Sequence, residues 1–314
     1  MLILKAGRRN SMEKYRINDE FLKRRIIENA DMSKHTSFKT GGSADYALFP
    51  QSVDELKTEV EALKKENIPY IVIGRGSNVL VSDSGIREVV VFSEKLKGIS
   101  LSGHNITAAS GVSMSEIANF AMKNSLCGME FMSGIPGSVG GGVYMNAGAY
   151  GAEIADIITG AEVLTETGEI KVLEKQDMCL GYRTSVFCGS GDIILGASFE
   201  LKDGKKDLIK AEMTELNRQR REKQPLEYPS AGSTFKRPEG YFAGKLIEDA
   251  GLKGFRIGGA MVSSKHCGFI VNYDKATSMD IYMLINHVRK TVMEKFGVML
   301  EPEVKMVGKF DDEL

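Results

Sequence analysis

The sequence predicts an α+β fold with two or three domains. The chain has 314 residues, which is more than one typical hydrophobic core accommodates. Short β-branched runs alternate with amphipathic helical patterns, and two glycine-rich segments interrupt the first two-thirds of the chain. A charged helical stretch, 204–223, then leads into a separate C-terminal unit that ends at residue 314.

Local signals place the elements before this stretch. Ser52–Glu55 is a capping box that begins one helix, and Ser113–Glu116 is a second capping box that begins another. Tyr70–Ile73 is a short apolar run typical of a buried strand. Residues 157–201 alternate as strands do, with a turn at Glu166–Glu169.

Two elements are predicted near the C-terminus. The apolar spacing predicts an amphipathic helix over Ala276–Phe296, closed by Gly297. A strand is predicted over Met299–Val307, and its period-2 alternation puts Glu301 and Glu303 on one face.

Composition excludes several classes of protein. The net charge is −1, which gives no reason to expect nucleic acid or a membrane surface as a partner, and no apolar run approaches a transmembrane span. The first residues lack the pattern of a secretory signal, so residues 1–20 are expected to be an N-terminal extension. Four scattered cysteines favour a reduced cytoplasmic location, and the four histidines show no ligand spacing, so no metal site is expected.

The most informative segment is Ser133–Gly151. Seven of its nineteen residues are glycine and none is charged, yet it contains several apolar side chains. An anion held there would be met by backbone N–H groups. The alternative is a tight packing corner between strands.

A second glycine-rich segment, Gly74–Val79, follows the predicted strand at Tyr70–Ile73. Val79 stands where a dinucleotide fingerprint would have its third glycine, and a strand follows where a helix should begin. The Rossmann and P-loop interpretations therefore fail. What remains is a strand–turn–strand that offers N–H groups and two polar side chains, or a plain hairpin.

Three further positions have both a functional and a structural interpretation. Arg183 lies in a glycine-flanked loop, Ser233 follows Gly232 in a segment of small residues, and Glu303 shares its strand face with Glu301. The alternatives are a surface arginine, a structural turn and a solvated strand face. No histidine or aspartate adjoins Ser233 to make it a nucleophile.

Together these segments resemble one family, the UDP-N-acetylenolpyruvoylglucosamine reductases (MurB) of bacterial cell-wall synthesis. The six matching motifs stand in order and span about 270 residues: 35–42, 73–78, 134–141 with 145–151, 181–183, 230–236 and 300–304. The short stretch between Arg183 and Lys202 resembles the branch of the family that lacks a tyrosine-bearing insertion. One departure is Lys305, where the family has arginine, so the bidentate fork is missing there.

The resemblance implies an FAD-binding domain of the vanillyl-alcohol-oxidase (PCMH) type in two lobes, residues 21–203 with a division near 85. It also implies a C-terminal α+β substrate domain, residues 204–314. FAD would be bound noncovalently, NADPH would be the reductant, and the substrate would be a UDP-sugar taken by a monomer. The implied cofactor-binding residues are Ile73, Gly74, Arg75, Gly76, Ser77, Asn78, Val79, Ser133, Ile135, Pro136, Gly137, Ser138, Gly140, Gly141, Asn146, Ala147 and Gly151.

The same resemblance assigns roles to the ambiguous positions. Hydride would add to C3 of the enolpyruvyl ether, with Arg183 and Glu303 stabilising the negative charge that develops and Ser233 donating a proton to C2. The implied substrate-binding residues are Tyr182, Lys236, Arg237 and Lys245. The alternatives are another FAD-dependent oxidase or dehydrogenase of the same fold, and a nonenzymatic nucleotide-sugar-binding protein.

Overall fold

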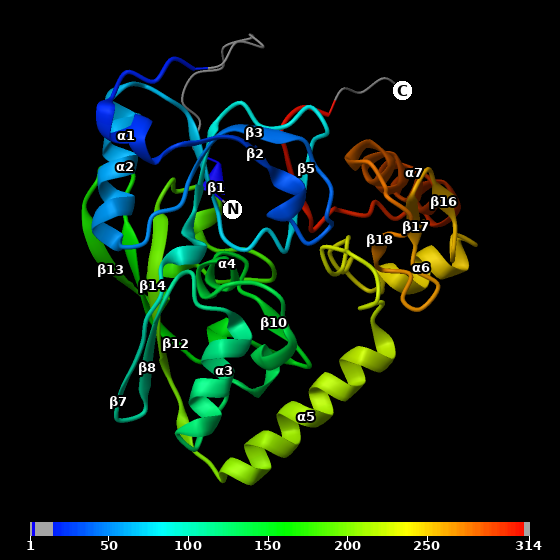
Figure 1. Ribbon diagram of the computed structural model, residues 1–314. Helices are drawn as coiled ribbons and strands as arrows, with labels where there is room; N and C mark the ends of the chain where they lie inside the picture. The colour runs from blue at the N-terminus through cyan, green and yellow to red at the C-terminus, as the bar shows by residue number, and fades with distance from the viewer. Residues whose placement is uncertain (1, 4–14, 311–314) are drawn as a thin grey trace. The chain divides into compact units, whose positions relative to one another are not determined.

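The computed structural model describes residues 2, 3 and 15–310 (Figure 1). Most of the predicted N-terminal extension therefore lies outside the described residues. The chain divides into two compact units, each made of discontinuous segments. The first unit is Met1–Ile27, Tyr46–Arg75 and Glu88–Arg220, and the second is Glu28–Asp45, Gly76–Arg87 and Arg221–Leu314. The functional domain boundaries at 204 and near 85 remain predictions.

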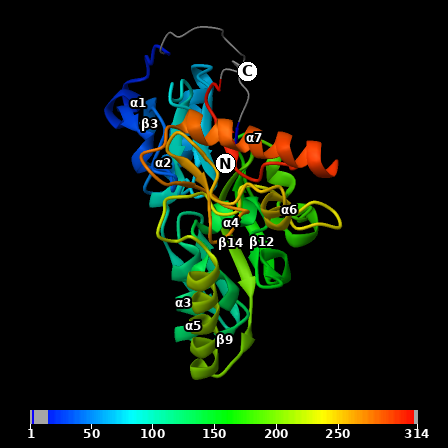
Figure 2. The same ribbon diagram turned by 90° about the vertical axis from the view of Figure 1, so that its right-hand side faces the viewer.

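An antiparallel sheet forms one layer of the first unit. Its strand order is β13-β12-β14-β8-β7, and β12 and β14 lie side by side in both views (Figures 1 and 2). The predicted turn between β12 and β13 is confirmed, since Thr165 N–H donates to Glu169 O at 2.8 Å. The strands are β7 (Ile99–Ser102), β8 (Asn105–Ala109), β12 (Ile158–Leu164), β13 (Ile170–Glu174) and β14 (Ile193–Glu200).

A second group of strands in this unit contains the predicted strand β4 (Tyr70–Ile73), whose four residues are all buried. It pairs in parallel with β6 (Val89–Phe92) and antiparallel with β1 (Leu2–Ile3). Residues 47 and 48 of β3 (Ser43–Leu48) pair with the other edge of β6. The remaining pairs are two-residue strands: β9 (Leu126–Cys127) with β15 (Lys202–Asp203), and β10 (Gly148–Ala149) with β11 (Ala152–Glu153).

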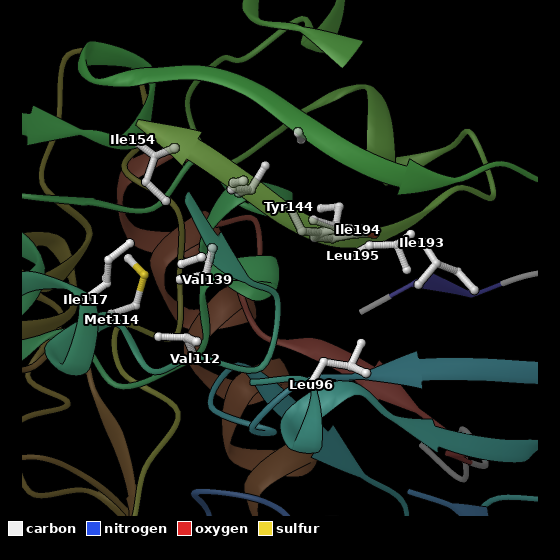
Figure 3. Packing of buried hydrophobic residues seen from close by; sticks show 14 of the residues in the cluster. Leu96, Val112, Met114, Ile117, Val139, Tyr144, Ile154, Ile193, Ile194 and Leu195 are labelled. Atoms are coloured by element: carbon white, nitrogen blue, oxygen red, sulfur yellow. The ribbon is translucent and has the colours of Figure 1, made fainter. Parts of the chain in front are cut away.

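The helices of the first unit are α1 (Glu20–Arg25), α2 (Val53–Lys65), α3 (Met114–Lys123), α4 (Val139–Tyr144) and α5 (Lys206–Lys223), whose last turn belongs to the second unit. The capping box at Ser113 is confirmed. At Ser52 only half of the predicted box forms, because the Glu55 carboxylate accepts from Gln51 N–H and pairs with Arg25 instead. The α4 side chains Val139 and Tyr144 pack into the core with α3 and β14 (Figure 3).

The second unit combines a three-stranded sheet with α7 (Ser278–Phe296), the predicted C-terminal helix. Gly297 closes α7 with φ 66°, as expected for a left-handed C-cap. The three-stranded sheet has the order β16-β17-β18, and β5 pairs in parallel with β19. The bounds are β2 (Ile27–Asp31), β5 (Val79–Val81), α6 (Ala243–Asp249), β16 (Arg256–Ile257), β17 (Ala260–Val262), β18 (Ile270–Asn272) and β19 (Lys305–Val307).

The strand predicted over Met299–Val307 is wrong over most of its length. Only Lys305–Val307 forms a strand, and Pro302 makes a single isolated bridge with Phe235. Proline has no N–H to donate to a ladder, which limits regular pairing at this point. Short 3-10 helices complete the chain: η1 (Met32–Lys34), η2 (Ser93–Lys95), η3 (Glu130–Gly134), η4 (Ile154–Asp156), η5 (Lys175–Met178) and η6 (Val186–Cys188).

Candidate functional site

The first glycine-rich segment forms the turn between β4 and β5, as predicted. Gly76 has φ +59°, and a Cβ there would overlap the carbonyl oxygen of His35. Ser37 N–H donates to Gly76 O at 3.1 Å, so residues 35–37 hold this turn. Gly76 is therefore required by the packing of the protein itself. The division between the units falls inside this segment, after Arg75.

The second glycine-rich segment is not one continuous loop. It contains the end of η3 and the six-residue helix α4, whose N-cap is Ser138. The N–H groups of Val139 and Gly140 donate to the carbonyl oxygens of Val112 and Ser110, at 2.8 and 2.9 Å. Gly142 N–H donates to Ser138 O at 2.8 Å, and Gly141 N–H donates to Ser138 Oγ at 3.5 Å. The expected nest of backbone donors is therefore narrower than predicted, because these four donors are already used inside the protein.

The glycines of this segment fall into two kinds. A Cβ on Gly140 would lie 2.8 Å from Ser110 Cβ, so packing disfavours a side chain there, and one on Gly142 would lie 2.8 Å from Met114 Sδ, so the Met114 side chain would have to shift. Gly141 differs: outside the backbone of its own helix, a Cβ would meet only Ser138 Oγ, at 3.6 Å, in the described part of the chain. A glycine that the fold leaves uncovered is typical of a place where a ligand approaches the backbone.

The two segments meet within the first unit. A Cβ on Gly74 would lie 2.6 Å from Ser138 Oγ, which places the N-cap of α4 beside the end of β4. Of the predicted cofactor-binding residues, Ile73 ends β4 and is buried, and Arg75 is exposed. The members of the second segment all lie in this unit: Ser133, Ile135, Pro136, Gly137, Ser138, Gly140, Gly141, Asn146, Ala147 and Gly151.

The loop that carries Arg183 is fastened to the second glycine-rich segment. The buried Asn146 side chain donates to Gly181 O at 3.1 Å, and Ser185 Oγ donates to Tyr144 O at 2.7 Å. Arg183 itself has φ 55° and donates from Nη2 to Gly148 O at 3.3 Å. Its guanidinium carbon lies 5.1 Å from the centroid of the exposed Tyr182 ring. The structure thus brings Arg183 to the predicted cofactor segment.

Ser233 and Glu303 lie on two hydrogen-bonded segments of the second unit. Glu303 N–H donates to Thr234 O at 2.8 Å, and Lys236 N–H donates to Glu301 O at the same distance. Thr234 is fully buried and its hydroxyl accepts from Ile270 N–H, so this register is fixed. Ser233 is exposed and Glu303 is partly buried. The two residues, 70 positions apart in sequence, are neighbours across this pair of segments.

The predicted substrate-binding cations make different contacts. Lys236 Nζ pairs with Glu301 Oε1 at 2.6 Å. Arg237 lies over the Phe242 ring, 4.0 Å from its centroid, and Lys245 pairs with Asp249 on the exposed face of α6.

Sequence reasoning missed two residues beside the second glycine-rich segment. On α5, Asn217 Nδ2 donates to Ser133 Oγ at 3.1 Å, and a Cβ on Gly134 would lie 3.0 Å from Arg220 Nη1. Burial lowers the pKa of Arg220. The i, i+3 spacing of Asn217 and Arg220 puts both on one face of the predicted helix, and this spacing could have indicated from the sequence that they lie together. Arg218, by contrast, pairs with Glu215 and lowers the pKa of that exposed carboxyl to about 2.

Other kinds of site are not found in the described residues. Within residues 2, 3 and 15–310, no cluster of His, Cys, Asp and Glu side chains could hold a metal ion. In the same part of the chain, no helix combines the length and apolar character needed to cross a bilayer.

Comparison with known proteins first defines the class. Residues 44–174 match the model of an FAD binding domain, and residues 224–307 match the C-terminal domain of UDP-N-acetylenolpyruvoylglucosamine reductase. The chain therefore combines an FAD-binding domain, of the class expected from the sequence, with this C-terminal domain.

The particular family follows from whole-chain relatives. The chain is 50% identical to a UDP-N-acetylenolpyruvoylglucosamine reductase of Lachnoclostridium phytofermentans, over 91% of this chain and 94% of the relative. It is 52% identical to that of Clostridium novyi, with the same coverage. The crystal structure of the Thermus caldophilus reductase superimposes with a TM-score of 0.79 at 34% identity, over 90% of this chain and 99% of that chain. The chain belongs to the UDP-N-acetylenolpyruvoylglucosamine reductase family.

Proposed function

We propose that this chain reduces UDP-N-acetylenolpyruvoylglucosamine to UDP-N-acetylmuramate with NADPH, through bound FAD, in the synthesis of the peptidoglycan precursor. Family membership supports the reaction. The structural observation that carries it is the hydrogen-bonded pair of segments in the second unit, which puts the exposed residue Ser233 and the partly buried residue Glu303 on adjacent stretches of backbone. A monomer in the cytoplasm is part of the proposal, since both substrates are small and water-soluble.

The residues present fit FAD. The missing side chain of Gly141 leaves space beside its backbone next to Ser138, whose Oγ accepts from Gly141 N–H, and Gly74 brings the end of β4 to the same place. Bound FAD would supply the hydride chemistry that links NADPH to C3 of the enolpyruvyl group. We assign the diphosphate of FAD to the backbone around Ser138 and Gly141. The segment contains no lysine or arginine, so backbone N–H groups would bind the anion.

The catalytic residues act on the charge that hydride addition creates. Addition at C3 leaves negative charge on C2 that spreads into the adjacent carboxylate. Arg183 is suited to that carboxylate because a guanidinium stays protonated and presents a fork of two donors. Glu303, as the neutral acid, donates a hydrogen bond to the same charge. Ser233 gives its proton to C2, a carbanion-like centre that is basic enough to take a proton from a hydroxyl.

Substrate binding is assigned to residues near these groups in sequence. Tyr182 adjoins Arg183 and is exposed, and Lys236 and Arg237 follow the Ser233 segment. The diphosphate of the UDP-sugar is the group that these cations suit, together with Lys245. Lys236 would exchange its contact with Glu301 for the substrate.

The decisive experiment separates the two half-reactions. Purified protein should be yellow, with FAD released by heat or acid, and NADPH should bleach it under anaerobic conditions. UDP-N-acetylenolpyruvoylglucosamine should then restore the flavin absorbance with formation of UDP-N-acetylmuramate. A bleached protein that the enolpyruvyl sugar leaves reduced would indicate another flavin oxidase or dehydrogenase of this fold. A colourless protein that binds the sugar would indicate a nonenzymatic binding protein.

A further inference from the structure

Asn78 contacts the segment that carries Glu303, which also bonds to Thr234. Its side-chain Nδ2 donates to Glu303 O at 3.1 Å, and its own carbonyl oxygen accepts from Lys305 N–H at 3.0 Å. All of these residues belong to the second unit. One residue of the first glycine-rich segment therefore holds the backbone on both sides of Val304.

These contacts leave Glu303 fixed at both of its backbone polar groups. Its N–H donates to Thr234 O, and its carbonyl oxygen accepts from the Asn78 amide. Val304, the next residue, is 3% exposed and is held in the core. The side chain of Glu303 stays partly exposed on a backbone that has little freedom.

The chemistry of the contact defines what Asn78 does. A carbonyl oxygen only accepts hydrogen bonds, so the NH2 end of the Asn78 amide must face Glu303. The Asn78 amide, which the sequence suggested as a donor to the cofactor, thus donates inside the protein. The adjacent strand β5 pairs with β19 and extends the contact between the two segments.

We propose that Asn78 is a positioning residue for the acid step, acting through Glu303, rather than a side-chain ligand of the cofactor. This inference rests on the proposed function, because it takes Glu303 as the carboxyl that stabilises the developing charge. Such a carboxyl must be placed to a fraction of an ångström, and a displacement of about 1 Å costs on the order of 100-fold in rate. The side-chain amide of Asn78 supplies one of the two hydrogen bonds that fix the backbone position of Glu303.

The test is a double-mutant cycle on the second half-reaction, with Asn78→Ala, Glu303→Gln and the double variant. Asn78→Ala should hold one FAD per chain with an unchanged spectrum and be reduced by NADPH at a near-normal rate. Its reoxidation by UDP-N-acetylenolpyruvoylglucosamine should slow by about 10–100-fold. In the Glu303→Gln background the same change should cost less than about twofold, because the effect passes through the carboxyl. The pH profile of reoxidation should shift in Asn78→Ala and not in the double variant.

Two further variants keep the test decisive. Asn78→Asp keeps the side-chain volume and lacks the donor, so it should repeat the slow reoxidation if Asn78→Ala folds poorly. Ser37→Ala is the matched control, because it removes the 3.3 Å bond from Ser37 Oγ to Ser77 O on the other side of the same turn. It should leave reoxidation unchanged.

The outcomes separate the inference from the proposed function. Loss of FAD in both Asn78 variants would make the amide a cofactor ligand and overturn the inference. An equal slowing in the wild-type and Glu303→Gln backgrounds would overturn it as well. If wild-type protein holds FAD and is reduced by NADPH but is not reoxidised by the enolpyruvyl sugar, the proposed function itself fails.

Discussion

The two units carry candidate functional groups of different kinds. In the first unit the glycine-rich segment works through missing side chains, since Gly141 leaves backbone open while neighbouring glycines serve the packing. In the second unit the candidate groups are side chains, Ser233 and Glu303, held in register by backbone hydrogen bonds. We therefore expect damage to the groups of the first unit to change how much flavin the protein holds. Damage to the second should change the acid step and leave the flavin in place.

The largest effect is expected in the second unit. Ser233→Ala should be reduced by NADPH at a near-normal rate, because that half-reaction needs no proton at C2. Its reoxidation by the enolpyruvyl sugar should slow by about 10²–10⁴-fold, the usual worth of general acid catalysis. Stopped-flow absorbance of the flavin measures both steps.

The matched variant for this prediction is Ser233→Cys, which keeps a proton at similar reach and should recover part of the loss. Equal slowing of both half-reactions in Ser233→Ala, or no slowing of either, would show that Ser233 is only a turn residue.

In the first unit, Gly141→Val should fold and lose flavin. Outside the backbone of its own helix, a Cβ there would meet only Ser138 Oγ among the described residues, so we expect the steric cost to fall on the ligand. We expect FAD to bind about 10–100-fold more weakly, the equivalent of a typical overpacking penalty. Titration of apoprotein with FAD measures this.

The matched control is Gly140→Ala, whose Cβ would lie 2.8 Å from Ser110 Cβ in the core. It should lower the melting temperature more than Gly141→Val does. Stoichiometric flavin in Gly141→Val would remove this glycine from the cofactor site.

Arg183 is an exception to this comparison, because it is a candidate catalytic side chain in the first unit. Arg183→Lys keeps the positive charge and loses the fork, so reoxidation should slow by about 10-fold while flavin content stays normal. Arginine and lysine bear the same backbone strain at the φ of 55° found here, so we expect the substitution to leave the backbone unchanged. A loss of flavin in this variant would place Arg183 with the cofactor segment instead of the acid step.

The sequence predicted the elements whose signals are local. The capping box at Ser113, the buried run Tyr70–Ile73 and the helix closed by Gly297 are all confirmed. Helix α4 was not predicted, because three consecutive glycines have poor helix propensity. Contacts from residues distant in sequence, Ser110 and Val112, hold its first turn.

The candidate site residues, too, could be predicted from the sequence only in part, because their contacts join residues distant in sequence. Residue types pointed to Arg183, Ser233 and Glu303, but only the resemblance to a family selected them from their alternatives. The neighbourhood of Ser233 and Glu303 depends on a pairing across 70 residues, and Pro302 restricts that pairing to an isolated bridge. Periodicity could not choose between Glu301 and Glu303; the structure adds that Glu301 pairs with Lys236, and the choice of Glu303 rests on the family resemblance.

The smallest effect is expected outside both parts of the site, at a buried carboxyl of the first unit. Glu59 is fully buried on α2, with Oε1 2.6 Å from Arg25 Nε. Its other oxygen, Oε2, has no hydrogen-bond partner among the described residues. Burial raises the pKa of Glu59 above its ordinary 4.5, and the ion pair with Arg25 opposes this only in part.

The sign of the pH dependence follows from that raised pKa. The folded protein binds this proton more tightly than the unfolded chain, so the stability it contributes is full below about pH 4.5. That contribution is lost as the pH rises through the raised pKa of the folded state. Glu59→Gln cannot ionise, and Arg25 keeps Glu55 as a partner at 2.6 Å. Melting temperatures measured from about pH 4.5 to neutral pH should therefore show wild type losing stability relative to Glu59→Gln, with both half-reactions and the flavin content of the two proteins alike. A constant difference in melting temperature across this range would contradict the prediction, and a change in either half-reaction would tie α2 to the site.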